Sequence, residues 1–195
     1  MRVFLRDDIE NISQEEMKDL LERLPDWRLE SALRFRHLAG RRENAAAFLL
    51  LSEALHDLYG ISPVPPFAYG EHGKPYIPDY PNIYFNMSHC RKAVACAIDE
   101  NPVGVDIEVI RSVKPGLVRY TMNGDEQQRI FGHPQPDMEF TRLWTRKEAV
   151  LKLAGEGVGS QMHDILLPER LERQGIQVGT FEGNGYVYSI AEKQV

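Results

Sequence analysis

The sequence predicts an α+β protein with two similar α+β lobes in a pseudo-twofold arrangement, in which antiparallel sheets pack against long helices. A faint internal repeat is the first observation behind this prediction. A long helical pattern ending in LYGIS (58–62) precedes a loop and short strand patterns, and another ending in GEGVGS (155–160) precedes the same order. We therefore expect an N-terminal lobe at 1–102 and a C-terminal lobe at 103–195.

Helical patterns dominate the first sixty residues. Ser13 and Glu16 are spaced as a capping box at the start of NISQEEMKDLLERL (11–24), where apolar residues recur at helical spacing. A second helix is expected over WRLESALRFRHLA (27–39) and a longer one over RRENAAAFLLLSEALHDLY (41–59), each followed by glycine. Three helices should therefore precede the first strands.

Proline and glycine interrupt the pattern at 61–82, which should form a long ordered loop. Strand patterns follow at 83–88, 93–98 and 103–110, and their short links predict an antiparallel meander.

The rest of the chain contains one further strong helix. Residues 110–137 are typical of a loop with one or two short helices, and 138–157 has an apolar face at helical spacing. The tail from Ile165 gives weak strand signals, best at YVYSIA (186–191). The run GEGVG (155–159) lacks the order of a phosphate-binding P-loop and should end the preceding helix.

Composition excludes several classes of protein. With 43% hydrophobic and 27% charged residues the chain should fold, and its net charge of −6 argues against general binding to nucleic acid or anionic membranes. Cys90 and Cys96 lack metal or redox spacing, so free thiols are expected. No segment approaches the roughly 18 apolar residues of a membrane span, and the N-terminus is acidic. A cytoplasmic location follows as an expectation.

Three acidic residues are candidates for a metal site. In VGVDIEVI (103–110) the valines and isoleucine alternate with Asp106 and Glu108, which should share one face of a strand. Glu148 and Lys152 should share one face of the later helix. On spacing alone, a solvated strand face and a surface ion pair are the favoured explanations of these patterns. The functional alternative is an Mg²⁺ site that works with substrate phosphates.

Other polar residues have both a functional and an ordinary interpretation. Ser88 and His89 are adjacent in a strand and should point to opposite faces, which argues against a Ser/His hydrolase and favours donors to phosphate. Lys74 lies in the turn EHGKP, as a solvated lysine or as one directed at a phosphate. Six arginines between 23 and 42 indicate either a solvated helix face or an anion-binding patch.

Four segments between residues 73 and 157 together resemble the 4′-phosphopantetheinyl transferases of the single-chain, pseudodimeric Sfp type. These segments are GKPYI, YFNMSHC, VGVDIEVI and LWTRKEAVLKLAGEG, in the order and near the spacing of that family. The resemblance implies the fold of that family. It also implies a holo-[acyl-carrier-protein] synthase activity: transfer of 4′-phosphopantetheine from coenzyme A to a serine of an acyl or peptidyl carrier protein, releasing adenosine 3′,5′-bisphosphate.

The resemblance also implies roles for individual residues. Mg²⁺ would be bound by three acids: Asp106, Glu108 and Glu148. Coenzyme A would be bound by Lys74, Ser88 and His89. Lys152 would lie near the pyrophosphate, and either Glu148 or a metal-bound water would take the proton of the carrier serine.

The chain departs from the family at the start of its long first helix. Many members have an arginine where this chain has alanines at 45–47. We expect Arg41 and Arg42, or else Arg34 and Arg36, to supply the missing phosphate contact.

Two other functions fit the same residues. They are an Mg²⁺-dependent pyrophosphate hydrolase and a non-catalytic module that binds coenzyme A or a carrier protein. For the transferase we expect a monomer. Its surface for the carrier is expected in the segment after the acidic strand, at Arg111, Val113, Lys114, Leu117, Arg119 and Met122.

Overall fold

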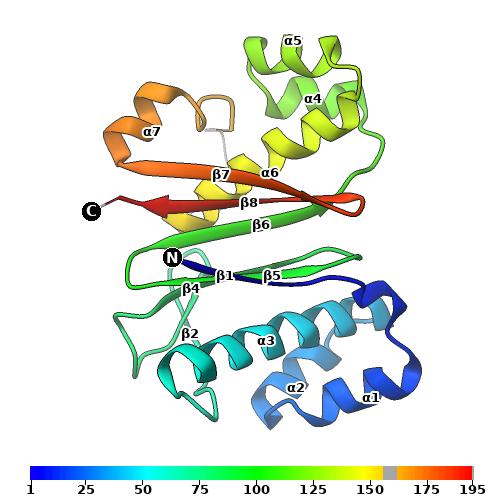
Figure 1. Cartoon of the computed structure of the whole chain (residues 1–195), viewed down its shortest axis with the longest axis vertical. Helices are drawn as coiled ribbons and strands as arrows, with labels where there is room; N and C mark the ends of the chain where they lie inside the picture. Colours follow the sequence, from blue (N-terminus) through cyan, green and yellow to red (C-terminus); the bar gives the residue numbers. More distant parts are fainter. Residues whose placement is uncertain (156–161, 195) are drawn as a thin grey trace.

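Two three-stranded antiparallel sheets lie next to each other in the middle of the molecule, with helices on either side of the pair (Figure 1). This computed structural model describes residues 1–155 and 162–194. The first sheet has the order β1 (Arg2–Arg6), β5 (Val94–Asp99), β4 (Tyr84–His89). The second has the order β6 (Val103–Val109), β8 (Tyr186–Lys193), β7 (Ile176–Gly183). The predicted α+β class is confirmed, whereas the lobe boundary at 102/103 stays a prediction.

Of the helices in the first half, α3 packs against the first sheet, and the others pack against α3 (Figure 1). They are η1 (Ile9–Asn11), α1 (Gln14–Glu22), α2 (Asp26–Leu33) and α3 (Leu38–Tyr59). The predicted capping box is present, because Ser13 Oγ accepts from Glu16 N–H and the Glu16 carboxylate accepts from Ser13 N–H. Gly60 ends α3 in the left-handed conformation, with φ of 69°.

The predicted extent of the second helix was wrong. Helix α2 stops at Leu33, and α3 begins at Leu38, so that Gly40 lies inside α3 instead of after a helix. The chain between them folds back on α3 and brings Phe35 against Gly40. A Cβ at Gly40 would lie only 2.8 Å from the Phe35 ring. Arg41 Nε also donates to the carbonyl of Phe35 (2.8 Å). Local spacing does not reveal this return of the chain.

The strands confirm part of the predicted order. The loop after α3 is mostly irregular and contains only a short hairpin, β2 (Ala68–Tyr69) with β3 (Pro75–Tyr76). β4 and β5 pair as predicted, but the meander stops there, because β6 pairs with β8 in the second sheet. β1 was not predicted and forms the edge of the first sheet beside β5.

Side chains, not a backbone ladder, join the two sheets where β4 lies beside β6. Val105 N–H donates to Asn86 Oδ1 (2.9 Å), and Ile107 N–H donates to Ser88 Oγ (3.3 Å). Moving two residues along β4, from Asn86 to Ser88, also moves two residues forward along β6, so the two strands run parallel. We call this junction, made by Asn86 and Ser88 with the backbone of β6, the seam.

The helices in the described part of the second half are α4 (Pro115–Thr121), α5 (Gly124–Gly132), α6 (Pro136–Ala154) and α7 (Pro168–Gln174). The two short helices and the long helix that follows are as predicted. Gly155 caps α6 in the left-handed conformation, and the remainder of the GEGVG run lies outside the described residues. Within the described chain, no helix is both long enough and apolar enough to cross a membrane.

Gly104 allows α6 to lie directly on β6. A Cβ at this position would be 2.0 Å from the carbonyl oxygen of Ala149 and 2.5 Å from the amide nitrogen of Leu153. Only glycine fits so close to another backbone. The backbone of α6 therefore fills the space beside Gly104.

Candidate active site

A cleft of about 320 Å³ lies at the seam, where β4, β6 and α6 meet. It is lined by Met87, Ser88, His89, Asp106, Glu108, Trp144, Glu148 and Lys152. Six of these were proposed from the sequence as site residues. The alternation of β6 brings its two acids to one side, and the helical spacing of α6 brings Glu148 and Lys152 to the same cleft.

Asp106 is the centre of a hydrogen-bonded cluster in this cleft. Lys152 Nζ lies 2.6 Å from Asp106 Oδ1 and 2.8 Å from Ser88 Oγ, and the Ser88 hydroxyl donates to the same Asp106 oxygen (2.9 Å). Asp106 is only 4% exposed. Its other oxygen, Oδ2, is buried and accepts no hydrogen bond within the described residues. A buried carboxylate oxygen without a partner is suited to a cation or a donor from a ligand.

The other two carboxylates of the cleft have raised pKa values. Burial, followed by repulsion from Asp106, raises the pKa of Glu148 to about 7. Burial and Asp106 also raise the pKa of Glu108. Both shifts mean that ionising all three acids together is unfavourable without additional positive charge. A divalent cation would supply that charge.

The acids fit an Mg²⁺ ion that is completed by a substrate. Within residues 1–155 and 162–194, no group of three or more His, Cys, Asp or Glu side chains is arranged to hold a metal by itself. Mg²⁺ usually binds only one or two carboxylates, and waters and phosphates fill the remaining positions. The unpartnered Asp106 Oδ2 and the neighbouring acids match this incomplete donor set. Asp106, Glu108 and Glu148 are therefore the residues that could hold the ion.

Ser88 and His89 point in different directions, as adjacent strand residues should. Ser88 is buried against Asp106, whereas His89 is exposed and its Nδ1 lies 3.2 Å from Glu43 Oε2 of α3. The histidine therefore does not activate the serine. Glu43 was missed by sequence reasoning, because nothing local links it to a residue 46 positions later.

Lys74 borders a different and larger cavity, of about 510 Å³, together with several tyrosines. Its ammonium donates to the carbonyls of Val103 (3.1 Å) and Leu153 (2.9 Å). Burial lowers the pKa of Lys74 to about 8. Lys74 thus links the loop of the first half to the start of β6 and the end of α6.

Arg41 and Arg42 are held by backbone carbonyls near the start of α3. Arg41 Nε donates to Phe35 and Arg42 Nη1 to Glu10 (3.0 Å). Neither residue lines the cleft or the cavity beside Lys74. Their proposed contact with a phosphate stays a prediction.

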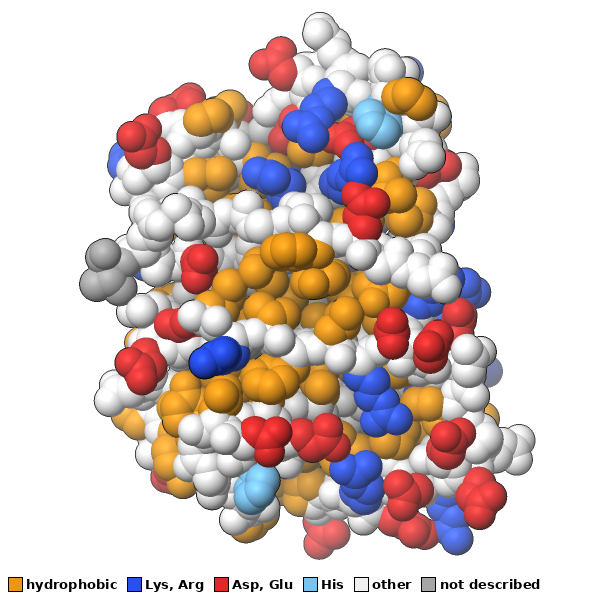
Figure 2. Space-filling model, viewed as in Figure 1, with side chains coloured by type: hydrophobic (Ala, Val, Ile, Leu, Met, Phe, Trp, Pro, Cys, Tyr) orange, Lys and Arg blue, Asp and Glu red, His pale blue; other side chains and the backbone are white. Residues whose placement is uncertain are grey.

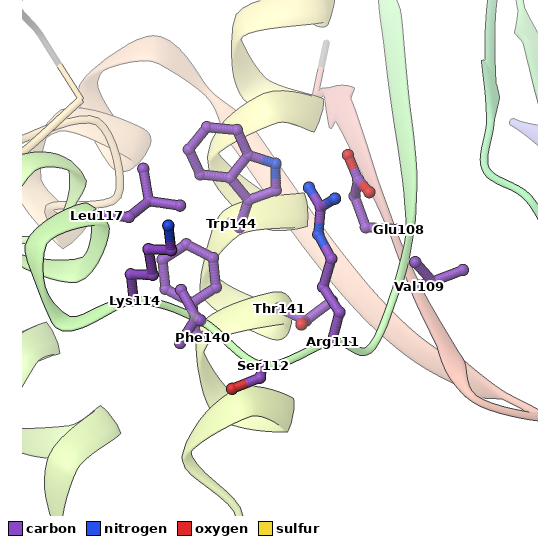
Figure 3. A pocket seen from close by; sticks show the side chains of 10 residues that line it. Glu108, Val109, Arg111, Ser112, Lys114, Leu117, Phe140, Thr141 and Trp144 are labelled. Carbon is purple, nitrogen blue, oxygen red and sulfur yellow. The ribbon is translucent and has the colours of Figure 1, made fainter.

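A third cavity, of about 280 Å³, adjoins the cleft and shares Glu108 and Trp144 with it. In Figure 3 the Arg111 side chain extends between the Trp144 ring and Glu108, and Leu117 and Phe140 lie on the other side. The acidic cleft thus lies beside a more apolar space bordered by cations.

Comparison with known proteins supports a family assignment. The family described as "4′-phosphopantetheinyl transferase superfamily" matches residues 102–191. The 4′-phosphopantetheinyl transferase AcpT of Salmonella typhimurium (strain LT2) is 35% identical over 149 residues, which cover 73% of this chain and 71% of AcpT. This chain belongs to the 4′-phosphopantetheinyl transferase family.

Two relatives from Bacillus subtilis extend the similarity. The 4′-phosphopantetheinyl transferase Sfp of strain 168 is 27% identical over 167 residues, covering 84% of this chain and 74% of Sfp. Another B. subtilis 4′-phosphopantetheinyl transferase is 33% identical over 135 residues, covering 66% of this chain and 59% of the relative. This chain thus spans less than two thirds of that relative. The predicted family is confirmed.

Proposed function

We propose that this member of the 4′-phosphopantetheinyl transferase family transfers the 4′-phosphopantetheine of coenzyme A to a serine of an acyl or peptidyl carrier protein in an Mg²⁺-dependent reaction. The observation that carries the proposal is the cleft at the seam. There Lys152 and Ser88 bind one oxygen of Asp106, and the other oxygen, beside Glu108 and Glu148, has no partner among the residues that the structure describes. Such a site combines cations with carboxylates, as phosphate transfer requires.

The chemistry divides between the metal and the side chains. Asp106, Glu108 and Glu148 would hold Mg²⁺, which would supply positive charge to the phosphoryl oxygens and the leaving phosphate. Lys152 supplies a second positive charge, and its 29% exposed side chain gives it access to a substrate in the cleft. Ser88 and His89 donate to the phosphates of the coenzyme. For Lys74 to do so, it would have to give up its bonds to two carbonyls.

In the transfer step the oxygen of the carrier serine attacks the phosphorus next to pantetheine. A new P–O bond forms, and the bond from this phosphorus to the adenosine-bearing phosphate breaks, which releases adenosine 3′,5′-bisphosphate. Glu148 lines the same cleft and takes the serine proton in this proposal. Positioning of both substrates supplies the rest of the acceleration.

The carrier protein docks, in this proposal, at the cavity shown in Figure 3. Arg111, Lys114 and Leu117 line it, and Leu117 is 42% exposed. These cations and the apolar side chain suit an acidic carrier with an apolar contact. The prediction from the sequence that Met122 belongs to this surface was wrong, because Met122 is fully buried in the core. We propose a monomer, because β4 and β6, one from each half of the chain, together with α6 supply both sides of the cleft, so that a second copy is not needed to form it.

The decisive experiment is an intact-mass assay. The purified chain, Mg²⁺ and coenzyme A are incubated with a panel of apo carrier proteins, and a carrier should gain the mass of one phosphopantetheine. Release of adenosine 3′,5′-bisphosphate without any carrier would instead indicate the pyrophosphate hydrolase. Binding of coenzyme A without any product would indicate a non-catalytic module.

A further inference from the structure

A second cluster of charged side chains lies away from the cleft, between α5, α6 and β7. It surrounds a cavity of about 270 Å³ that is lined by Arg129, Arg142, Leu143, Arg146, Thr180 and Glu182. We call this the arginine pocket. Figure 2 shows Lys and Arg side chains gathered near acidic ones in the upper part of the visible face, over these elements. Nothing in the proposed transfer step uses it.

The arginine pocket and the cleft lie on opposite sides of α6. Arg142 and Arg146 are one turn apart and share one side of the helix. Trp144, Glu148 and Lys152 share another side, and two residues along a helix correspond to a rotation of about 200°. A ligand in the arginine pocket would therefore not contact the carboxylates of the cleft.

Two acids neutralise most of the charge in the pocket. Glu139 is 1% exposed and pairs with Arg129 and Arg142 (2.9 Å for Arg142), while Arg142 also pairs with Glu182. Three guanidinium groups thus face two carboxylates. One positive charge is left over.

Arg146 carries that excess charge. Within the described residues it has no ion pair or hydrogen bond, and its Nε is buried without a partner. Burial, followed by repulsion from Arg129, lowers the pKa of Arg146, and attraction by Glu139 and Glu126 offsets only part of this. A guanidinium that is partly removed from water and lies beside a like charge is stabilised by a bound anion.

We propose that the arginine pocket binds a phosphate group, either as inorganic phosphate or as the monoester of a small molecule. Arg129 and Arg146 approach from two helices, and the Thr180 hydroxyl, which lies 3.0 Å from Ser189 Oγ, is on a strand at the same cavity. Donors from several directions suit the tetrahedral oxygens of phosphate better than a planar carboxylate. Glu182 does not block binding, because its carboxylate is engaged by Arg142.

The test follows arginine side chains directly. Inorganic phosphate is titrated into the full chain, without coenzyme A or Mg²⁺, while the arginine Nε–Hε resonances are recorded by NMR at constant ionic strength with sodium chloride. Phosphate should shift the Arg146 resonance in a saturable way. Glucose 6-phosphate as a second ligand separates a monoester from the free ion, since the preferred source should bind more tightly. Unchanged Arg146 signals with both ligands would overturn the proposal.

Matched variants assign the effect to the pocket. Arg146→Gln should weaken phosphate binding at least tenfold, whereas Arg173→Gln, the same change at an exposed position on α7, should leave it unaltered. Lys152→Met removes a cation from the cleft and should not move the Arg146 shift. Equal binding by Arg146→Gln and the original chain would refute the site. Equal shifts with acetate would refute its preference for phosphate.

Discussion

Lys152 Nζ lies 2.6 Å from Asp106 Oδ1, and both atoms also lie within hydrogen-bond distance of the Ser88 hydroxyl. This contact joins the helix that carries Glu148 to the strand that carries Glu108. Because Ser88 belongs to the first sheet, the same three groups also connect the two halves of the chain. Asp106 is therefore the residue on which both the metal site and the alignment of the cleft should depend.

Replacing Asp106 should abolish transfer without unfolding the protein. Asp106→Asn keeps the shape of the side chain but removes the charge that pairs with Lys152 and that, in the proposed site, binds Mg²⁺. We expect the transfer rate to fall by about 10²-fold or more, as for other losses of electrostatic stabilisation in active sites. Mass spectrometry of the carrier and circular dichroism measure the two effects. Asp57→Asn, an exposed change on α3, is the control. Normal transfer by Asp106→Asn would contradict the site.

Mg²⁺ binding should release protons in a pH-dependent way. With a pKa of about 7, Glu148 is mostly protonated at pH 6 and must lose its proton to bind a metal. At pH 8 it is mostly ionised already. Calorimetry in buffers of different ionisation enthalpy should thus detect more protons released at pH 6 than at pH 8, and tighter binding at pH 8. Glu148→Gln should remove the difference. Equal proton release at both pH values in the original chain would argue against Glu148 as a ligand.

Gly104 should tolerate no side chain. In Gly104→Ala the new Cβ would overlap the backbone of α6, at Ala149 and Leu153. We expect the free energy of unfolding to fall by about 3 kcal/mol, at the upper end of the usual cost of overpacking. Gly116→Ala is the matched control, because nothing lies within 4 Å of a Cβ there. Denaturant unfolding of both variants gives the comparison, and similar stability would show that α6 does not pack as described.

Lys74 should make stability depend on pH above neutrality. The folded state lowers its pKa from 10.5 to about 8, so the unfolded chain binds more protons between these values. The free energy of unfolding due to Lys74 therefore increases as pH rises from 8 to 10.5. Relative to Lys74→Met, the original chain should gain stability over that interval.

Lys18→Met on the exposed face of α1 serves as the control for this measurement. It should follow the original chain at every pH. A constant difference between Lys74→Met and the original chain from pH 7 to 10 would mean that Lys74 is not buried as an ammonium.

Features set by neighbouring residues were predictable from the sequence. The capping box of Ser13 and Glu16 and the alternation that brings Asp106 and Glu108 to one face depend only on local spacing. The gathering of these acids with Glu148 and Lys152 was inferred with help from the family resemblance. Their proximity itself depends on how α6 lies on β6.

Features set by distant contacts were not predictable. Nothing in RVFLR shows that β1 will pair with β5 about ninety residues later. Whether the ammonium of Lys74 meets a phosphate or a carbonyl depends on where α6 ends, at Leu153. The excess charge of Arg146 likewise emerges only after Glu139 has paired with two other arginines.

The seam makes a backbone amide sensitive to the contents of the cleft. Ile107 N–H has Ser88 Oγ as its acceptor, and this same oxygen also binds Lys152 and Asp106. A phosphate that draws the Ser88 hydroxyl away would weaken the bond to Ile107. Hydrogen exchange at the Ile107 amide should then become faster as substrate fills the cleft. The exchange rate of this amide, at the junction between the sheets, would therefore measure how much of the cleft is occupied.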